Sequence, residues 1–317
     1  MADAALLDSH SLGADIDLSG LQQTDYNWQI HATTSTDELT ARIRTASVLI
    51  TNKVVIDAEA MSHTTALQLI CVAATGTNNV DLDAARQRGI SVCNVTGYAT
   101  PSVVQHVMML ILTLSTRLLD YRAAVNRGDW QRSAFFCLLD YPISELHGKT
   151  LGIIGYGELG RAVATMAQHF GMHVLVAQSL TGEPRADRVA LDELLPQVDV
   201  LSLHCPLSDA SRMLINAERL AQMKPGALLI NAARGGIVDE VALLDALQRG
   251  HLGGAGIDVL AVEPPQADSP LLLQTLNNLI VTPHIAWASK ASRQRLFDEV
   301  ISNILAWRDG KQRNRIV

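Results

Sequence analysis

The sequence predicts an α/β protein of two domains, each built on a parallel sheet. Short apolar runs of strand length alternate with helix-compatible stretches along the chain, as in sheets joined by helical crossovers. The chain has 317 residues, and a domain usually takes roughly 100–200 residues. Apolar residues make up 48% of the chain and charged residues 18%, which excludes a disordered or low-complexity protein.

The first hundred residues predict a small parallel α/β domain. Turn residues bound its expected strands, which are 4–7, 46–51, 67–74 and 90–95. Pro101 then precedes a long apolar segment, 103–119, whose length fits a buried helix better than a strand. We place the domain boundary there.

From Lys149 onward the alternation is clearer and predicts a doubly wound sheet. The helix after Gly157 is expected to end at Gly171 and to bury a face of Leu159, Val163, Met166 and Phe170. A final helix is expected over 290–307. The six expected strands are 150–154, 173–177, 198–204, 227–231, 254–259 and 279–282.

Residues 155–160 read G-x-G-x-x-G directly between an expected strand and an expected helix. In this context the first glycine permits a tight turn, the second lets the backbone approach a pyrophosphate, and the third lets helix and strand pack closely. The helix N-terminus adds oriented N–H groups for the phosphates. The second domain is therefore predicted to be a Rossmann-type, dinucleotide-binding domain.

The choice between NAD and NADP is open. Gln178 occupies the end of the second strand of this domain, where an acidic residue would bond the adenosine ribose 2′-hydroxyl. An uncharged side chain does not repel a 2′-phosphate, and Arg185 follows shortly after. NADPH is therefore allowed, although Gln178 can equally bond a 2′-hydroxyl while Arg185 lies on the surface.

Four polar side chains are expected at the sheet edge that carries the glycine loop. Arg234 follows one strand, Asp258 lies near the end of the next with Glu263 in the loop beyond it, and His284 follows the last. Ligands of open α/β sheets bind beyond the carboxyl ends of the strands. The sequence therefore brings these residues to one candidate site.

These residue types suit hydride transfer to a 2-keto acid. Arg234 offers a planar fork for a carboxylate and can polarise the adjacent carbonyl. His284 can protonate the forming alkoxide, and Glu263 can fix its tautomer and favour its protonated form. Asp258 can accept a hydrogen bond from the nicotinamide carboxamide.

Four motifs, in order, make the sequence similar to the D-isomer-specific 2-hydroxyacid dehydrogenases. They are the glycine loop 155–160, N-A-A-R-G-G at 231–236, D-V-L-x-x-E-P at 258–264 and T-P-H-I-A at 282–286. The resemblance implies an active site of Arg234, Glu263 and His284, an NAD or NADP cofactor and a homodimer. It also implies a split, flavodoxin-like substrate domain (1–100 plus 289–317) around a dinucleotide-binding domain (101–288).

The resemblance extends to the substrate and cofactor contacts. The loop 74–81 matches the family segment that offers backbone N–H groups to the substrate carboxylate, here Thr75, Gly76 and Thr77; Gly76 allows close approach because it lacks a Cβ. The segments 102–106 and 284–288 look most like the glycerate dehydrogenase (hydroxypyruvate reductase) branch. The expected cofactor contacts are Gly155, Tyr156, Gly157, Glu158, Leu159, Gly160, Gln178, Cys205, Pro206, Ala233 and Asp258.

Other functions fit less well. Phosphoglycerate dehydrogenase shares the core, but many forms carry a further C-terminal regulatory domain. Formate dehydrogenase predicts Gln in place of Glu263. An NADH-sensing corepressor would keep the same residues and act by binding proteins, and a methyltransferase would leave Arg234 and His284 unexplained.

Charge and cysteine content indicate the setting. The net charge of −7 and the pI near 5.8, without a basic run, argue against nucleic acid as a partner. The sequence shows no secretory signal and no apolar run long enough for a membrane span. The four cysteines lack metal-like spacing, so we expect reduced thiols, no metal and a cytoplasmic protein. Tyr98, Trp130 and Trp287 are expected either to shape a pocket or to fill core.

Overall fold

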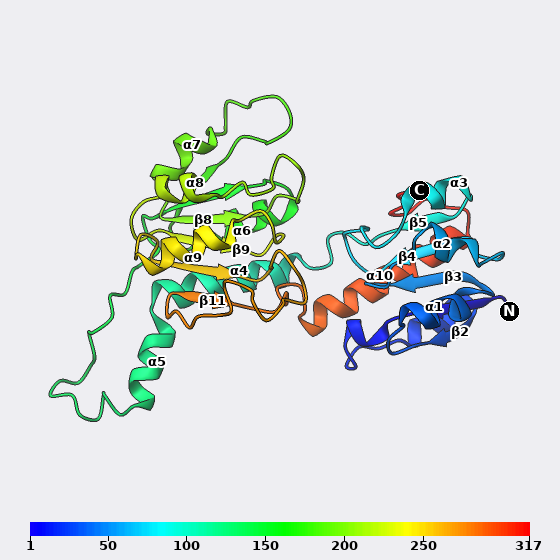
Figure 1. Ribbon diagram of the computed structural model, residues 1–317, viewed down its shortest axis with the longest axis horizontal. Helices are drawn as coiled ribbons and strands as arrows, with labels where there is room; N and C mark the ends of the chain where they lie inside the picture. Colours follow the sequence, from blue (N-terminus) through cyan, green and yellow to red (C-terminus); the bar gives the residue numbers. More distant parts are fainter. The chain divides into compact units, whose positions relative to one another are not determined.

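The computed structural model describes residues 1–317. The chain divides into two compact units, which are Met1–Ala99 with Trp287–Val317, and Thr100–Ala286. Each unit contains one parallel sheet with helices on it (Figure 1). The α/β fold predicted from the alternation of apolar runs is therefore confirmed.

Unit 1 has a five-stranded parallel sheet in the order β2-β1-β3-β4-β5. Its strands are β1 (Asp3–Leu6), β2 (Asn27–Ile30), β3 (Ala46–Thr51), β4 (Leu69–Val72) and β5 (Ser91–Cys93). Its helices are α1 (Thr36–Ile43), α2 (Ala58–Ser62), α3 (Leu82–Gln87) and α10 (Lys290–Arg308), with 3-10 turns η1 (Ser9–Leu12) and η2 (Ser19–Thr24). The edge strand β2 was not predicted, because most of its residues are exposed and it lacks an apolar run.

Both faces of this sheet are covered. All six residues of the central strand β3 are buried, which explains why four of them, Ala46 and 48–50, are apolar. Helix α10 packs on one face through Leu296, Phe297, Val300 and Ile304. Leu39 and Ile43 of α1 contribute to the core on the other. The C-terminal helix thus completes the core of the unit formed by the N-terminal residues.

Unit 2 has a six-stranded parallel sheet in the order β11-β10-β9-β8-β6-β7. All six strands were predicted, and they are β6 (Thr150–Ile154), β7 (His173–Val176), β8 (Val200–Leu203), β9 (Leu228–Asn231), β10 (Gly254–Ile257) and β11 (Leu279–Val281). The strand order reverses between β6 and β8, which makes the carboxyl ends of these two strands the expected ligand crevice. The helices are α4 (Thr100–Ser115), α5 (Leu118–Asn126), α6 (Glu158–His169), α7 (Leu191–Leu194), α8 (Ala217–Gln222) and α9 (Glu240–Gln248), with one 3-10 turn η3 (Leu195–Gln197).

Two predictions about the helices of unit 2 were wrong. The single helix expected over 103–119 is two helices, α4 and α5, which meet at 60° where Arg117 adopts a left-handed φ of 53°. On α6, Met166 and Phe170 are each 40% exposed; the buried side instead consists of Gly160, Val163, Ala164 and Ala167. Small residues let α6 pack closely. Gly171 does follow the helix end with φ 75°, as predicted.

No single helix is long and apolar enough to cross a bilayer; only α4 and α5 taken together reach that length, and they are bent at their junction.

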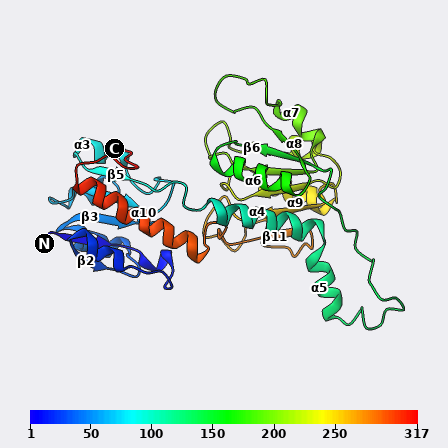
Figure 2. The same ribbon diagram turned by 180° about the vertical axis from the view of Figure 1, so that it is seen from behind.

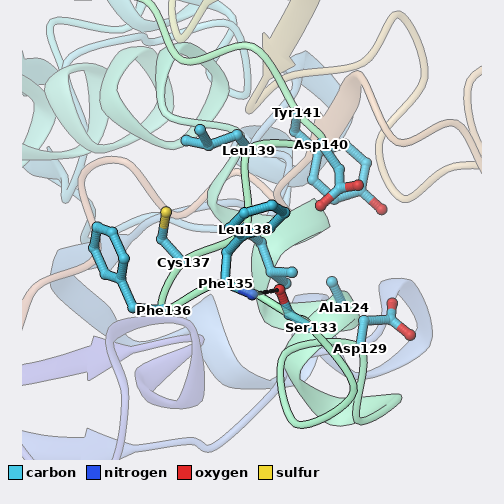
Figure 3. Close-up of a pocket in the computed structure, with 10 residues that line it drawn as sticks. All are labelled: Ala124, Asp129, Ser133, Phe135, Phe136, Cys137, Leu138, Leu139, Asp140 and Tyr141. Carbon is cyan, nitrogen blue, oxygen red and sulfur yellow. Dashed lines mark hydrogen bonds between the residues drawn. The ribbon is translucent and has the colours of Figure 1, made fainter.

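An arm formed by α5 and residues 127–145 projects from the sheet of unit 2 (Figures 1 and 2). Trp130 Nε1 donates to the carbonyl oxygen of Phe136 at 2.9 Å, and the hydroxyl of Tyr121 donates to the carbonyl oxygen of Tyr141 at 2.7 Å. These bonds order the arm around an open cavity of about 760 Å³ (Figure 3). Trp130 thus belongs to the arm.

Candidate active site

The glycine loop follows β6 and leads into α6. Gly155 has φ 90°, and a Cβ there would lie 2.4 Å from the backbone nitrogen of Cys205. A Cβ on Gly160 would lie 2.1 Å from the carbonyl oxygen of Gly155. A Cβ on Gly157 would meet nothing within 4 Å. Two glycines therefore allow close packing, and the third leaves bare backbone at the start of α6, which fits a pyrophosphate group.

Gln178 is engaged within the protein. Its Nε2 donates to the carbonyl oxygens of Arg185 and Arg188 at 2.9 and 3.1 Å, and its Oε1 accepts from the backbone N–H of Arg185 at 3.0 Å. The side chain of Arg185 pairs with Asp187 at 2.9 Å on the surface. Gln178 therefore holds the loop after β7 in place.

Arg188 lies at the glycine loop and was missed in the sequence. Its guanidinium carbon lies 5.8 Å from the centroid of the Tyr156 ring, within cation–π range. Its Nε is buried and has no hydrogen-bond partner. A buried donor without an acceptor is costly, so this atom suits an anionic ligand. Nothing in the local sequence distinguishes Arg188 from Arg185, because the contact with Tyr156 is non-local.

The remaining predicted cofactor residues line the same strand ends. The Glu158 side chain bonds the hydroxyl of Thr100, so that carboxylate is engaged with α4. Burial raises the pKa of the Cys205 thiol, which makes Cys205 a poor nucleophile. The carbonyl oxygen of Pro206 accepts from Ser211 Oγ at 2.7 Å. Leu159 continues the first turn of α6.

His204 is a further residue that the sequence did not identify. It follows β8, and its Nε2 lies 2.9 Å from Ser202 Oγ, while its Nδ1 is buried without a partner. Burial lowers the pKa of His204 to about 4, so the ring is neutral at neutral pH. The backbone of His204, and not its ring, lies close to Gly155, where a Cβ would be 2.5 Å from the His204 carbonyl carbon.

Arg234 projects from a turn that Asn231 and Gly235 define. Asn231 is 1% exposed; its Nδ2 donates to the carbonyl oxygen of Arg234 at 3.0 Å, and its Oδ1 accepts from the N–H of Ala233 at 3.1 Å. A Cβ on Gly235 would lie 1.8 Å from the carbonyl oxygen of Leu260. The Arg234 turn therefore packs directly on the loop after β10, while the guanidinium itself is exposed.

Glu263 and His284 form a hydrogen-bonded pair. Glu263 Oε2 lies 2.6 Å from His284 Nδ1, and both side chains are 34% exposed. Glu263 Oε1 accepts from the backbone N–H of Leu260 at 2.9 Å, which orients the carboxylate. Because a carboxylate only accepts, Nδ1 carries a proton. Nε2 is left to exchange a proton with a ligand.

Asp258 holds the turn that carries His284. Asp258 is 1% exposed, and its carboxylate accepts from Thr282 Oγ1 at 2.6 Å and from the N–H groups of Ile285 and Ala286, each at 2.9 Å. Its carbonyl oxygen accepts from the N–H of His284 at 2.8 Å. His284 has φ 54°, a region that non-glycine residues seldom adopt. These bonds keep the strained turn in one conformation.

The structure brings Arg234, Glu263 and His284 to one edge, because β9, β10 and β11 are neighbours in the sheet.

Thr75–Thr77 belong to unit 1, where Thr75 Oγ1 donates to the carbonyl oxygen of Val95 at 2.9 Å. Tyr98 and Trp287 pack edge-on at 6.4 Å within that unit against its apolar core. No group of three His, Cys, Asp or Glu side chains is arranged to hold a metal ion.

Known proteins resemble this chain over most of its length. Residues 108–286 match the family model "D-isomer specific 2-hydroxyacid dehydrogenase, NAD binding domain". Glycerate dehydrogenase from Methylorubrum extorquens is 45% identical over 90% of this chain and 90% of its own. Hydroxypyruvate reductase from Blautia hydrogenotrophica is 38% identical over 94% of each chain.

A solved structure shows the same fold. D-lactate dehydrogenase from Aquifex aeolicus, in complex with NAD and lactic acid, is 30% identical with a TM-score of 0.81 and covers 97% of this chain and 96% of its own. The motif order, the strand-end geometry and these similarities agree. The chain therefore belongs to the D-isomer-specific 2-hydroxyacid dehydrogenases, a family of oxidoreductases, and carries their NAD-binding domain.

Proposed function

We propose that this protein reduces a small 2-keto acid with NADH or NADPH, and that the substrate is hydroxypyruvate or glyoxylate, giving D-glycerate or glycolate. The observation that carries the proposal is the Glu263–His284 pair, joined at 2.6 Å, on the sheet edge that also carries Arg234 and the glycine loop. The substrate choice is supported by the relatives named for glycerate and hydroxypyruvate.

In this proposal the catalytic residues are Arg234, Glu263 and His284. Arg234 binds the substrate carboxylate and polarises the keto oxygen. A nicotinamide cofactor held at the glycine loop 155–160 would supply the hydride for the keto carbon when bound. His284 Nε2 gives its proton to that oxygen as the C–O double bond becomes single. Glu263 stabilises the imidazolium needed for this transfer, and solvent then returns the proton to His284.

The units take complementary roles in the proposal. Residues 101–288 form the dinucleotide-binding domain, and residues 1–100 with 289–317 form the substrate domain. Backbone N–H groups at Thr75, Gly76 and Thr77 bind the substrate carboxylate. The hydrogen bond from Asn94 Nδ2 to the carbonyl oxygen of Thr75, 2.8 Å long, supports this because it holds the loop in place.

We also propose that NADPH is accepted beside NADH. Gln178 carries no charge that would repel a 2′-phosphate, and Arg188 offers a donor without a partner at the glycine loop. Asp258 Oδ2 accepts one N–H within the protein, from Ala286, so it retains capacity for the nicotinamide carboxamide. The contacts proposed for the phosphates are the backbone N–H groups of residues 155–160, with Cys205, Pro206 and Ala233 beside them.

The arm supports a homodimer. Phe135, Phe136 and Leu139 are 77%, 91% and 84% exposed, although hydrogen bonds order the segment that carries them. An exposed apolar surface of this kind is typical of a protein–protein interface. In a dimer with two-fold symmetry, the same surface of the second copy would bury it. Replacing Phe135 and Leu139 by serine is expected to convert dimers to monomers in light scattering, whereas Val241→Ser, 65% exposed on α9, leaves the mass unchanged.

Cytoplasmic location is part of the proposal. Cys71 and Cys93 face each other on β4 and β5, and all four cysteines are free thiols. The four cysteines also lack the spacing of a metal site, which fits unpaired thiols in a reducing compartment. The net charge of −7 supports small acids rather than nucleic acid as partners.

The test is absorbance at 340 nm with purified protein, NADH or NADPH, and hydroxypyruvate, glyoxylate, pyruvate or 3-phosphohydroxypyruvate. Rapid oxidation of the cofactor is expected with hydroxypyruvate or glyoxylate. The His284→Ala variant serves as the control for cofactor oxidation that does not depend on His284. Faster turnover of pyruvate or 3-phosphohydroxypyruvate would contradict the substrate assignment. Cofactor binding without turnover of any acid would favour the alternative function, an NADH-sensing protein that acts by binding other proteins.

A further inference from the structure

We propose that His106 and Thr282 are positioning residues that hold the His284 turn in its reactive conformation, acting through Asp258. The proposal rests on the proposed role of His284 as proton donor. His106 lies on α4 and Thr282 directly follows β11. Neither side chain forms a hydrogen bond with the side chain of His284. Both are connected to it by the carboxylate of Asp258.

Helix α4 holds the His284 turn at two points. Ser102 and His106 are four residues apart and so lie on one face of the helix. Ser102 Oγ donates to the carbonyl oxygen of Ala286 at 2.7 Å, and His106 Nε2 lies 3.0 Å from Thr282 Oγ1. These contacts bracket residues 282–286.

The proton positions in this network follow from its geometry. Thr282 Oγ1 lies 2.6 Å from Asp258 Oδ1, and a carboxylate can only accept, so the hydroxyl proton points to Asp258. The hydroxyl oxygen must then accept from His106, which places a proton on His106 Nε2. Burial lowers the pKa of His106, an effect that Asp258 opposes. The expected species is neutral imidazole with its proton on Nε2.

This arrangement matters because the turn is strained at His284. The carboxylate of Asp258 accepts three hydrogen bonds, of which two come from the backbone of the turn and the third from Thr282. Thr282 in turn is oriented by His106. Removing the hydroxyl would free one carboxylate oxygen to shift and would leave the buried His106 Nε2 with only its longer contact to Asp258 Oδ1, at 3.4 Å. A displacement of about 1 Å at a reacting group can cost about 10²-fold in rate.

The variants that test this are Thr282→Val, which removes the hydroxyl at constant shape, and Thr282→Ser, which keeps it. Thr282→Val is expected to lower kcat about 10-fold or more with little change in the affinity for NADH, and Thr282→Ser is expected to remain within about 3-fold. His106→Leu should behave like Thr282→Val, and His106→Gln should restore activity because its amide N–H replaces Nε2–H.

A double-variant cycle separates positioning from general destabilisation. If His106 acts through Thr282, His106→Leu has little further effect on kcat once Thr282→Val is present. Met108→Ala, at a buried position on the same helix, is the structural control; it is expected to lower the unfolding temperature without the loss in kcat. Additive losses in the double variant, or an equal loss in Met108→Ala, would overturn the proposal.

A spectroscopic measurement tests the network without turnover. In ¹⁵N-histidine NMR, His106 is expected as the neutral Nε2–H tautomer, assigned by its absence in His106→Gln. The Nδ1–H tautomer, or an unchanged His106 signal in Thr282→Val, would refute the inferred direction of the hydrogen bonds. If His284→Ala retains full turnover, the proposed function fails instead, whatever the His106 spectrum shows.

Discussion

Lowering the pH should destabilise the NAD-binding domain through one buried histidine. The pKa of His204 is lowered by burial from 6.5 to about 4 in the fold. Below pH 6.5 His204 is protonated in the unfolded chain but stays neutral in the folded chain, so lowering the pH stabilises the unfolded state. The contribution of neutral His204 is therefore complete above pH 6.5 and is lost as the pH falls toward 4.

The magnitude follows from the difference between these two pKa values. At about 1.4 kcal/mol per tenfold change in proton affinity, full titration corresponds to about 3 kcal/mol. Between pH 7.5 and pH 4.5 the titration is incomplete, because the pH stays above the folded-state pKa of about 4, and we expect about 2 kcal/mol. This is large against the roughly 5–15 kcal/mol that stabilises a typical domain.

The assay is urea unfolding at several pH values, compared between the natural protein and His204→Gln. Glutamine can still bond Ser202 but does not titrate in this range. All other titrations are shared, so the difference between the two curves isolates His204. The curves should converge by about 2 kcal/mol between pH 7.5 and pH 4.5. Parallel curves would show that His204 is not held neutral and that the reasoning from burial is wrong.

Three further substitutions test the site itself. His284→Ala should lower kcat by about 10²–10⁴ in a protein with an unchanged circular dichroism spectrum; retained turnover would remove His284 from the chemistry. Glu263→Gln should lower kcat, because His284 Nδ1 loses the carboxylate that accepts its hydrogen bond at 2.6 Å; an unchanged kcat would contradict that role. Arg188→Ala should weaken binding of 2′,5′-ADP about 10-fold while 5′-AMP is little affected in calorimetry, and Arg185→Ala should change neither; equal losses for both ligands would argue against a 2′-phosphate contact.

The strands of both sheets could be predicted because parallel strands are buried on both faces. A strand such as β3, with every residue buried, is mostly apolar and so stands out in the sequence. The glycine loop and the strand-end residues could also be predicted, since parallel strands place their carboxyl ends on one edge. The strand β2 was not predicted, because an exposed edge strand does not have a run of apolar residues.

The features that were missed depend on a local backbone conformation or on contacts between distant positions. The apolar content of 103–119 does not reveal the bend at Arg117, which is a local left-handed conformation. The helical spacing on α6 suggested that Met166 is buried, but the close approach of small residues moved the buried side. Arg188 and His106 acquire their significance from Tyr156 and Thr282, which lie 32 and 176 residues away in the chain.

The reactive side chains are exposed, so their precision must come from the turns that carry them. Asn231 and Asp258, each 1% exposed, stand at the ends of β9 and β10 and bond the backbones of the turns that contain Arg234 and His284. A flexible guanidinium or imidazole on a rigid turn loses less conformational freedom on meeting its substrate. Asn231 and Asp258 therefore matter to catalysis as much as Arg234 and His284. Their hydrogen bonds fix the two turns to the buried sheet, and the turns in turn fix the positions of the exposed side chains.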